Sequence, residues 1–200
     1  MENNQSDVVI AGIGQTPVGE RWDVSLRELA AEAILPALKD SGGLKPDVIY
    51  IGNMLAASAS RQANLGALLA EDVGLNGIEA VTVEAADASG GAALRMAYMA
   101  IVSGAVDVAL AVGVEKCSDV IGSRFETHLS QMLDADYEAA QGLTPISLAS
   151  LLFNRYLYEN TAEHTHFGGF PEVAHANAVS NAHAMFRSPL SGEHYQAQAQ

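Results

Sequence analysis

The sequence predicts an α/β fold, in which a mainly parallel sheet is covered by helices, followed by a mainly helical region. Four short runs rich in β-branched residues alternate with three segments of helical periodicity over residues 1–115. This β-α-β-α-β-α-β order is typical of a parallel sheet with helical crossovers. No strand-like run follows Val114. We therefore expect two domains, an α/β half over residues 1–117 and a helical loop or cap region over residues 118–200.

The first elements carry clear start and stop signals. An apolar run at 8–14 that ends in glycine predicts a buried parallel strand. Ser25 and Glu28 have the spacing of a capping box, which predicts a helix that ends at the glycine pair 42–43. Residues 48–52 predict the second strand, and the apolar stripe of residues 61–73 predicts a helix.

The next helix differs from the others in polarity. Residues 80–84 predict the third strand, residues 89–103 the third helix and residues 106–113 the fourth strand. The third helix has almost no polar face, so we expect it to be enclosed on several sides. A helix that covers a sheet and is apolar all round needs a further layer on its outer side.

The remainder of the chain predicts helices and one loop. We expect helices at 128–140, 146–158 and 173–185, and a loop rich in Thr, His and Gly at 160–170. The last residues, 196–200, are expected to fray.

Composition and charge limit the possible partners. The formal net charge of −14 argues against binding to nucleic acids and to anionic membranes. It also means that an anionic ligand would need locally placed Arg or Lys side chains. Cys117 is the single cysteine, so an intrachain disulfide is impossible and a reducing compartment is expected. The polar residues 1–7 do not resemble a secretory leader, so we expect a cytoplasmic protein.

The most informative position is Asp87, in the tight turn between the third strand and the third helix. Such a turn places residue 87 where helix amides point outward and the helix dipole is positive. A thiol there would have a lowered pKa and would be a nucleophile, but the chain supplies a carboxylate. We favour an N-cap role for Asp87. A base or nucleophile is the alternative, although the same dipole weakens a carboxylate as a base.

Other candidates have structural interpretations. Gly12, Gly14 and Pro17 do not complete a dinucleotide-binding motif, and Ser89 is expected to be a helix cap. Cys117 is expected to be a small buried hydrophobe. The histidines have no Cys or paired carboxylates at metal-binding spacing, so we expect no metal site.

Residues 84–91 (Glu-Ala-Ala-Asp-Ala-Ser-Gly-Gly), the apolar helix and residues 107–116 together closely resemble the N-terminal half of thiolases. The likeness is greatest to the sterol-carrier-protein-2-like and archaeal acetyl-CoA acetyltransferase branch. Residues 10–17, 51–54, 174–179 and 184–189 support it, so the resemblance spans nearly the whole chain in order.

This resemblance implies a layered fold of two similar halves, with the apolar third helix of each half buried between them. It implies Claisen or thiolytic chemistry on coenzyme A thioesters, with CoA as substrate and no covalently bound cofactor. The family's acyl-carrying cysteine falls at Asp87 of this chain. Ser89 and Gly90, which follow it, are expected to bind the substrate, and Arg155 and Arg187 in the loop domain are candidates for contacting the phosphates of CoA.

The chain departs from the family in two ways. Asp87 stands at the position of the nucleophilic cysteine, and we expect the last strand of the first half and the whole second half to be missing from this chain. We therefore expect a protein of acyltransferase lineage that is inactive alone. The alternatives are a non-catalytic assembly subunit, or an aldolase or lyase that needs no cysteine. The resemblance also implies a homodimer through the strand of Val81, Thr82 and Val83, or a hetero-oligomer with a chain that supplies the second half.

Overall fold

The computed structural model describes residues 7–198, which form two compact units by their contacts. The first unit contains residues 7–16 and 21–128, and the second contains residues 17–20 and 129–198. Residues 118–128 thus belong to the first unit.

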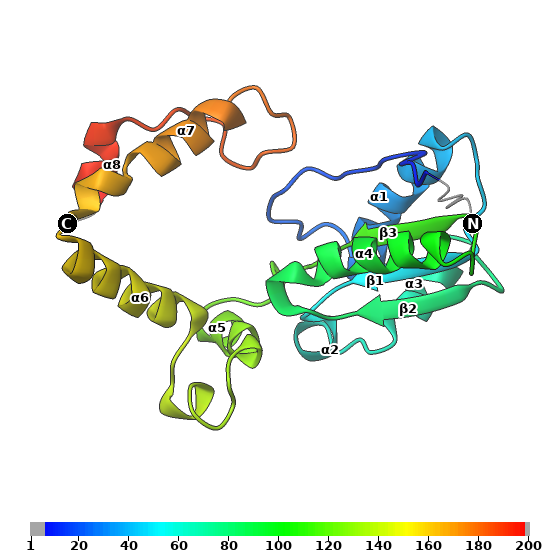
Figure 1. The fold of residues 1–200 in the computed structure, drawn as a ribbon, viewed down its shortest axis with the longest axis horizontal. Helices are drawn as coiled ribbons and strands as arrows, with labels where there is room; N and C mark the ends of the chain where they lie inside the picture. The colour runs from blue at the N-terminus through cyan, green and yellow to red at the C-terminus, as the bar shows by residue number, and fades with distance from the viewer. Residues whose placement is uncertain (1–6, 199–200) are drawn as a thin grey trace, which may run out of the picture. The chain divides into compact units, whose positions relative to one another are not determined.

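A parallel three-stranded sheet forms the centre of the first unit (Figure 1). Its order is β2 (Glu79–Val83), β1 (Val48–Gly52), β3 (Ala109–Gly113), with Val48 opposite both Glu79 and Ala109. All five residues of β1 are buried, as expected for the central strand of a covered parallel sheet. The predicted α/β class is confirmed.

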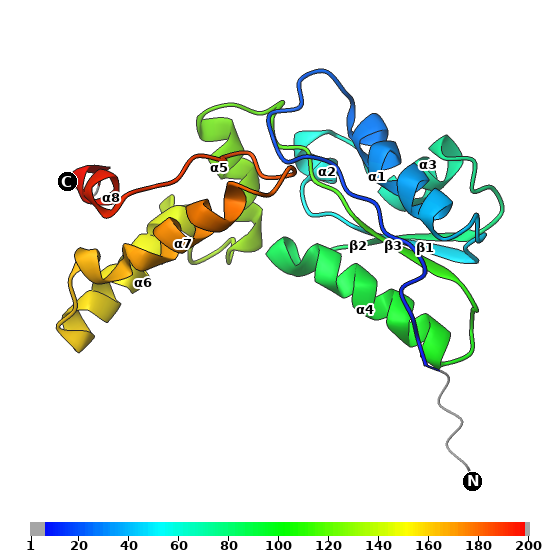
Figure 2. The ribbon, with the colours of Figure 1, turned by 90° about the horizontal axis from the view of Figure 1, so that it is seen from above.

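Helices cover both faces of this sheet (Figure 2). Helices α1 (Leu26–Asp40) and α3 (Leu65–Asp72) lie on one face, and α4 (Ser89–Val102) lies on the other. Because side chains alternate along a strand, β1 supplies both cores. Ile49 and Ile51 pack with the α1 and α3 side, while Val48 and Tyr50 pack with Ala93 and Ala97 of α4.

The predicted capping box is confirmed at the start of α1. The backbone N–H of Ser25 donates to Glu28 at 2.7 Å, and the N–H of Glu28 donates to the Ser25 hydroxyl at 3.3 Å. The predicted strand at 48–52 and the helix that begins at Ser89 are also observed.

The predicted strand at 8–14 is wrong. These residues are extended along α1, where Gly12 and Gly14 lie against the helix backbone and the N–H of Ile13 donates to Asp40 at 2.9 Å. The segment takes no place in the sheet, and within residues 7–198 the strand β3 pairs with β1 alone. A strand is defined by its ladder of hydrogen bonds, and this segment forms none with the free edge of either β2 or β3.

Two further boundaries differ from the prediction. The helix expected at 61–73 is replaced by α2 (Ala56–Ala59) and α3, because Arg61 and Asn64 have left-handed φ angles of 54° and 53°. The strand β3 begins at Ala109, not at 106, since the carboxylate of Asp47 accepts from the N–H groups of Asp107 and Val108. The strand β2 lies one residue earlier than expected.

The helix predicted at 128–140 is also wrong. Instead, α5 (Ser123–Leu129) is followed by two short 3-10 turns, Ser130–Met132 and Ala139–Gln141.

The second unit is helical. Helix α6 (Pro145–Asn160) is confirmed and is capped by Thr144. A 3-10 turn at His164–Phe167 lies in the predicted loop. Helix α7 (Gly169–Ala178) begins before the expected residue 173, because a proline is tolerated in its first turn. Helix α8 (Gly192–Gln198) includes residues 196–198, which we expected to fray, and residues 199–200 lie outside the described part. Within residues 7–198, no helix combines the length and apolar character that crossing a bilayer requires.

Candidate functional site

The candidate site is the turn that joins β2 to α4. In a parallel sheet the loops after the strands meet at one edge, where ligands of α/β proteins bind. Here those loops follow Gly52 of β1, Val83 of β2 and Gly113 of β3. The turn of residues 84–88 is the middle one along the chain.

The turn is held in a strained conformation by two polar side chains. Ala86 has a left-handed φ of 48°, which is uncommon for a residue other than glycine. Its N–H donates to the carboxylate of Glu84 at 2.6 Å. The hydroxyl of Ser89, which is buried, accepts from the N–H of Ala85 at 2.9 Å and donates to the carbonyl of Ala86 at 2.6 Å. The backbone around residue 87 is therefore fixed without any contribution from that residue's side chain.

Asp87 lies in a short 3-10 turn (Ala86–Ala88) and is exposed. The N-cap position of α4 is Ala88, and no side chain caps it. The predicted N-cap roles of Asp87 and Ser89 are therefore both wrong. Ser89 instead closes the turn, and the carboxylate of Asp87 forms no hydrogen bond or ion pair with any residue in the described range.

Three glycines allow the start of α4 to lie directly on the strand ends. A Cβ atom added at Gly52 would come within 2.5 Å of the Ser89 carbonyl oxygen and 2.7 Å of the Gly90 Cα. A Cβ atom on Gly113 would lie 3.6 Å from the same Gly90 Cα. The turn at Asp87 is thus positioned by backbone-to-backbone packing, which is more rigid than contact through side chains.

The sequence analysis missed two residues that join the loops, Asn53 and Glu115. The buried amide of Asn53 donates to the Val114 carbonyl at 2.7 Å and to Glu115 at 2.9 Å, and its oxygen accepts from the N–H of Ala56. The Glu115 carboxylate also accepts from the N–H groups of Met54 and Leu55, both at 2.9 Å. A polar residue one or two positions after an apolar strand was the signal that could have identified both.

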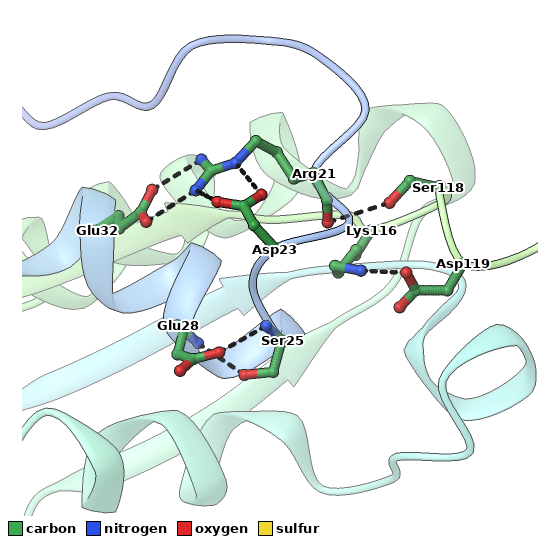
Figure 3. A network of polar contacts seen from close by, with 8 residues as sticks. All are labelled: Arg21, Asp23, Ser25, Glu28, Glu32, Lys116, Ser118 and Asp119. Carbon is green, nitrogen blue, oxygen red and sulfur yellow. Dashed lines mark hydrogen bonds and ion pairs between the residues drawn. The ribbon is translucent and has the colours of Figure 1, made fainter.

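A second polar network braces the loop after β3 (Figure 3). Arg21, which precedes α1, forms ion pairs with Glu32 at 2.8 Å and with Asp23 at 3.1 Å. Its backbone carbonyl accepts from the hydroxyl of Ser118. Lys116 is buried and pairs with Asp119. The guanidinium of Arg21 holds the pKa of the Glu32 carboxyl below its ordinary value, mainly through its hydrogen bonds.

The remaining candidates lie elsewhere. Cys117 is half-buried, and burial first, then the charge of Glu115, raise the pKa of its thiol, as expected for an unreactive cysteine. Arg155 and Arg187 belong to the second unit. Arg155 pairs with Glu159 at 2.7 Å and lies over the ring of Tyr158. Among residues 7–198, no three His, Cys, Asp or Glu side chains are grouped as metal ligands.

The parallel sheet, the strained turn and the helix that starts on the strand ends define an α/β domain built around that turn. The chain matches the family described as thiolase, N-terminal domain, over residues 8–167, and it belongs to this family.

Its relatives are longer than this chain. It is 39% identical over 189 residues to an acetyl-CoA acetyltransferase of Methanothermobacter thermautotrophicus, covering 94% of this chain and 49% of the relative. It is 40% identical over 182 residues to an acetyl-CoA acetyltransferase of Methanocaldococcus jannaschii, covering 90% and 46%. The chain therefore spans about half the length of the curated relatives it matches.

One solved structure has the same fold. An aldolase described as Ltp2-ChsH2(DUF35) superposes with a TM-score of 0.68 over 94% of this chain and 47% of that chain, at 22% identity.

Proposed function

We propose that this chain is the N-terminal half of a thiolase-like acyl-CoA acyltransferase, and that by itself it performs no covalent acyl transfer. Its substrate class is the coenzyme A thioester, as the names of its acetyl-CoA acetyltransferase relatives suggest. The second half of the fold would come from another polypeptide or from further chain. We propose a cytoplasmic setting.

The observation that carries this proposal is the free carboxylate of Asp87 at the start of α4. Attack of a carboxylate on a thioester would form a mixed anhydride, and its charge would oppose the oxyanion that develops in the transition state. A thiolate at the same place would be activated by the helix and would form a stable thioester. The fold thus keeps the acyl-carrier turn while residue 87 lacks the nucleophile.

Intact mass measured after incubation with acetyl-CoA tests the inactivity of the chain. We expect no acetyl adduct on the wild-type chain or on an Asp87→Ala variant. An adduct that forms on the wild type and disappears in Asp87→Ala would contradict the proposal.

A second candidate function, that of a non-catalytic assembly subunit, is favoured by the outer face of α4. Ala93 and Ala97 face the sheet, whereas Leu94, Tyr98 and Met99 are 57%, 47% and 47% exposed. The sequence predicted that this helix is enclosed, and its outer face is apolar and uncovered within the described residues. Burial of a large apolar side chain stabilises by roughly 1.5–3 kcal/mol, so three on one helix favour a covering partner.

Light scattering during size-exclusion chromatography tests the assembly role. We expect self-association, through the strand of Val81, Thr82 and Val83 or through α4, or stable capture of a chain that carries the second thiolase half. A monomer that binds no apolar dye would exclude this candidate.

A cysteine-independent aldolase or lyase is the third candidate. The free carboxylate of Asp87 could act as a base without forming a covalent intermediate. The solved structure of similar fold carries the name of an aldolase, which motivates an assay for retro-aldol cleavage of acyl-CoA substrates. Cleavage that is unchanged in Asp87→Asn would remove Asp87 from this role.

A further inference from the structure

The first unit contains a hollow of about 400 Å³ that the turn at Asp87 does not line. It lies between the loop after β1 and the loop after β3, which continues into α5. On the first side it is lined by Ser58 of α2 and by Arg61. On the second side it is lined by Asp119 and Ile121 of the loop after β3, and by Arg124 and His128 of α5. This volume is within the range of small-molecule sites.

The charge of the hollow is opposite to the charge of the chain. Arg61 and Arg124 both line it, and neither forms an ion pair or hydrogen bond with a residue in the described range. The one carboxylate in the lining, that of Asp119, is already paired with Lys116. Two uncompensated positive charges thus face one hollow in a protein of net charge −14. Acidic groups farther away than about 10 Å are largely screened at physiological salt, so the local arginines determine what binds.

One residue of the lining, His128, also has a hydrogen-bonding atom without a partner. His128 Nδ1 is buried and has no partner among the described residues. A buried polar atom without a partner costs free energy, and in a native protein it calls for an explanation such as an absent ligand. Arg124 and His128 are four residues apart on α5, so both side chains lie on the same face of that helix.

The backbone of Arg61 is strained, which is a common feature of residues at binding sites. Its φ of 54° is a left-handed conformation that costs about 1 kcal/mol or more for a non-glycine residue. Strain of this kind persists where the surroundings impose it, often next to ligands.

We infer that this hollow is a binding site for a phosphate group, held by the guanidinium groups of Arg61 and Arg124. In this structure His128 Nδ1 is closed to solvent, so its part in the site requires a rotation of the ring that turns this nitrogen toward the ligand. Arginine matches the oxygens of phosphate with pairs of parallel N–H donors, and a neutral histidine ring supplies a further N–H donor in one tautomer. Binding at this site does not depend on acyl transfer at Asp87. The phosphate group that it binds is carried either by coenzyme A or by a free phosphate compound.

Calorimetric titration of the full chain with inorganic pyrophosphate at low salt tests the inference. We expect Arg61→Gln and Arg124→Gln each to weaken binding about tenfold, since each removes a charge-assisted contact. Arg95→Gln is the matched control: Arg95 is an exposed arginine on α4 that does not line the hollow, and its loss should leave binding unchanged. Absence of binding to the wild type, or equal weakening in the control, would overturn the inference.

His128→Phe gives an independent readout. The phenyl ring removes the unpaired nitrogen, so we expect the variant to be as stable as the wild type or more stable in urea, while pyrophosphate binds more weakly. Loss of stability together with unchanged binding would show that the histidine serves packing alone and would contradict its part in the site.

Coenzyme A and pantetheine, which lacks phosphates, distinguish the two sources of phosphate. If coenzyme A binds with the same dependence on Arg61 and Arg124 and pantetheine does not, the phosphate is that of coenzyme A. If only pyrophosphate shows this dependence, the ligand is a separate phosphate compound. Either result supports the phosphate site, and neither depends on whether the chain can accept an acyl group.

Discussion

Replacement of Gly52 by alanine tests whether the turn at Asp87 is positioned by the packing of α4 on the strand ends. The new Cβ atom would lie 2.5 Å from the Ser89 oxygen, 2.6 Å from the Ser89 carbonyl carbon and 2.7 Å from the Gly90 Cα. Ordinary contacts begin near 3.4 Å, so strand and helix must separate by roughly 1 Å. All three atoms are backbone atoms and cannot rotate away.

We expect this separation to lower the free energy of unfolding by about 2–3 kcal/mol, the usual cost of overpacking a core. The corresponding fall in melting temperature is roughly 4–12 °C for a chain of this length. Gly91→Ala is the matched control, because a Cβ atom on Gly91 would meet nothing within 4 Å. Alanine should stabilise the helix there by about 0.5–1 kcal/mol.

Urea unfolding followed by circular dichroism measures both variants. Both substitutions add the same methyl group, one at the end of β1 and one in the first turn of α4, so their opposite effects on stability isolate the steric contact. A Gly52→Ala variant as stable as Gly91→Ala would refute the argument that the backbone of α4 rests on the end of β1.

Two other predictions follow from the polar contacts of the first unit. Glu115→Ala should lower the free energy of unfolding by roughly 2–4 kcal/mol and speed hydrogen exchange at the Leu55 amide, because the donors of buried Asn53 and Leu55 lose their acceptor. Glu71→Ala is an exposed control whose carboxylate has no partner among the described residues, and it should change little. An unchanged exchange rate at Leu55 would contradict this. The pKa of Glu32 is lower in the folded chain than its ordinary value of 4.5, so its contribution to stability is complete above pH 4.5 and is lost as the pH falls through the folded value. Below pH 4.5 the stability of the wild type should therefore fall more steeply with pH than that of Arg21→Met. If the urea unfolding midpoints of the two proteins fall equally with pH in that range, the effect is excluded.

Local signals in the sequence predicted the elements that depend on nearby residues. The capping box of Ser25 and Glu28 needs only four consecutive residues, and it is observed. The strand at 48–52 is apolar on both faces, which is what burial beneath two helix layers requires. These features are decided by short-range chemistry that the sequence displays directly.

Features that depend on distant partners could not be predicted in this way. The segment 8–14 has the composition of a strand, but a strand also needs a hydrogen-bonded neighbour, and this segment pairs with no strand of the described residues. The left-handed Arg61 has no marker in the sequence, and it shortens a helix that periodicity alone predicted. Likewise, periodicity indicated that α4 is apolar all round without showing that its outer face is uncovered.

The elements around Asp87 were predicted from the sequence, but the contacts that hold them were not. The strand, tight turn and helix around Asp87 were identified from the sequence, and the structure contains them. The N-cap role failed because Ser89 and Glu84 already occupy the hydrogen bonds that shape the turn. Asn53 and Glu115 were missed, since their contacts join loops about sixty residues apart in the chain.

The central claim is that residue 87 occupies an acyl-carrier turn whose nucleophile is absent, and the pH profile of alkylation tests it most directly. In an Asp87→Cys variant that also carries Cys117→Ser, the one thiol should react with iodoacetamide with a pKa well below the ordinary value of about 8.5, because the first amides of α4 stabilise a thiolate. A thiol with a pKa at or above that value would show that this turn cannot activate a nucleophile, and would contradict the account.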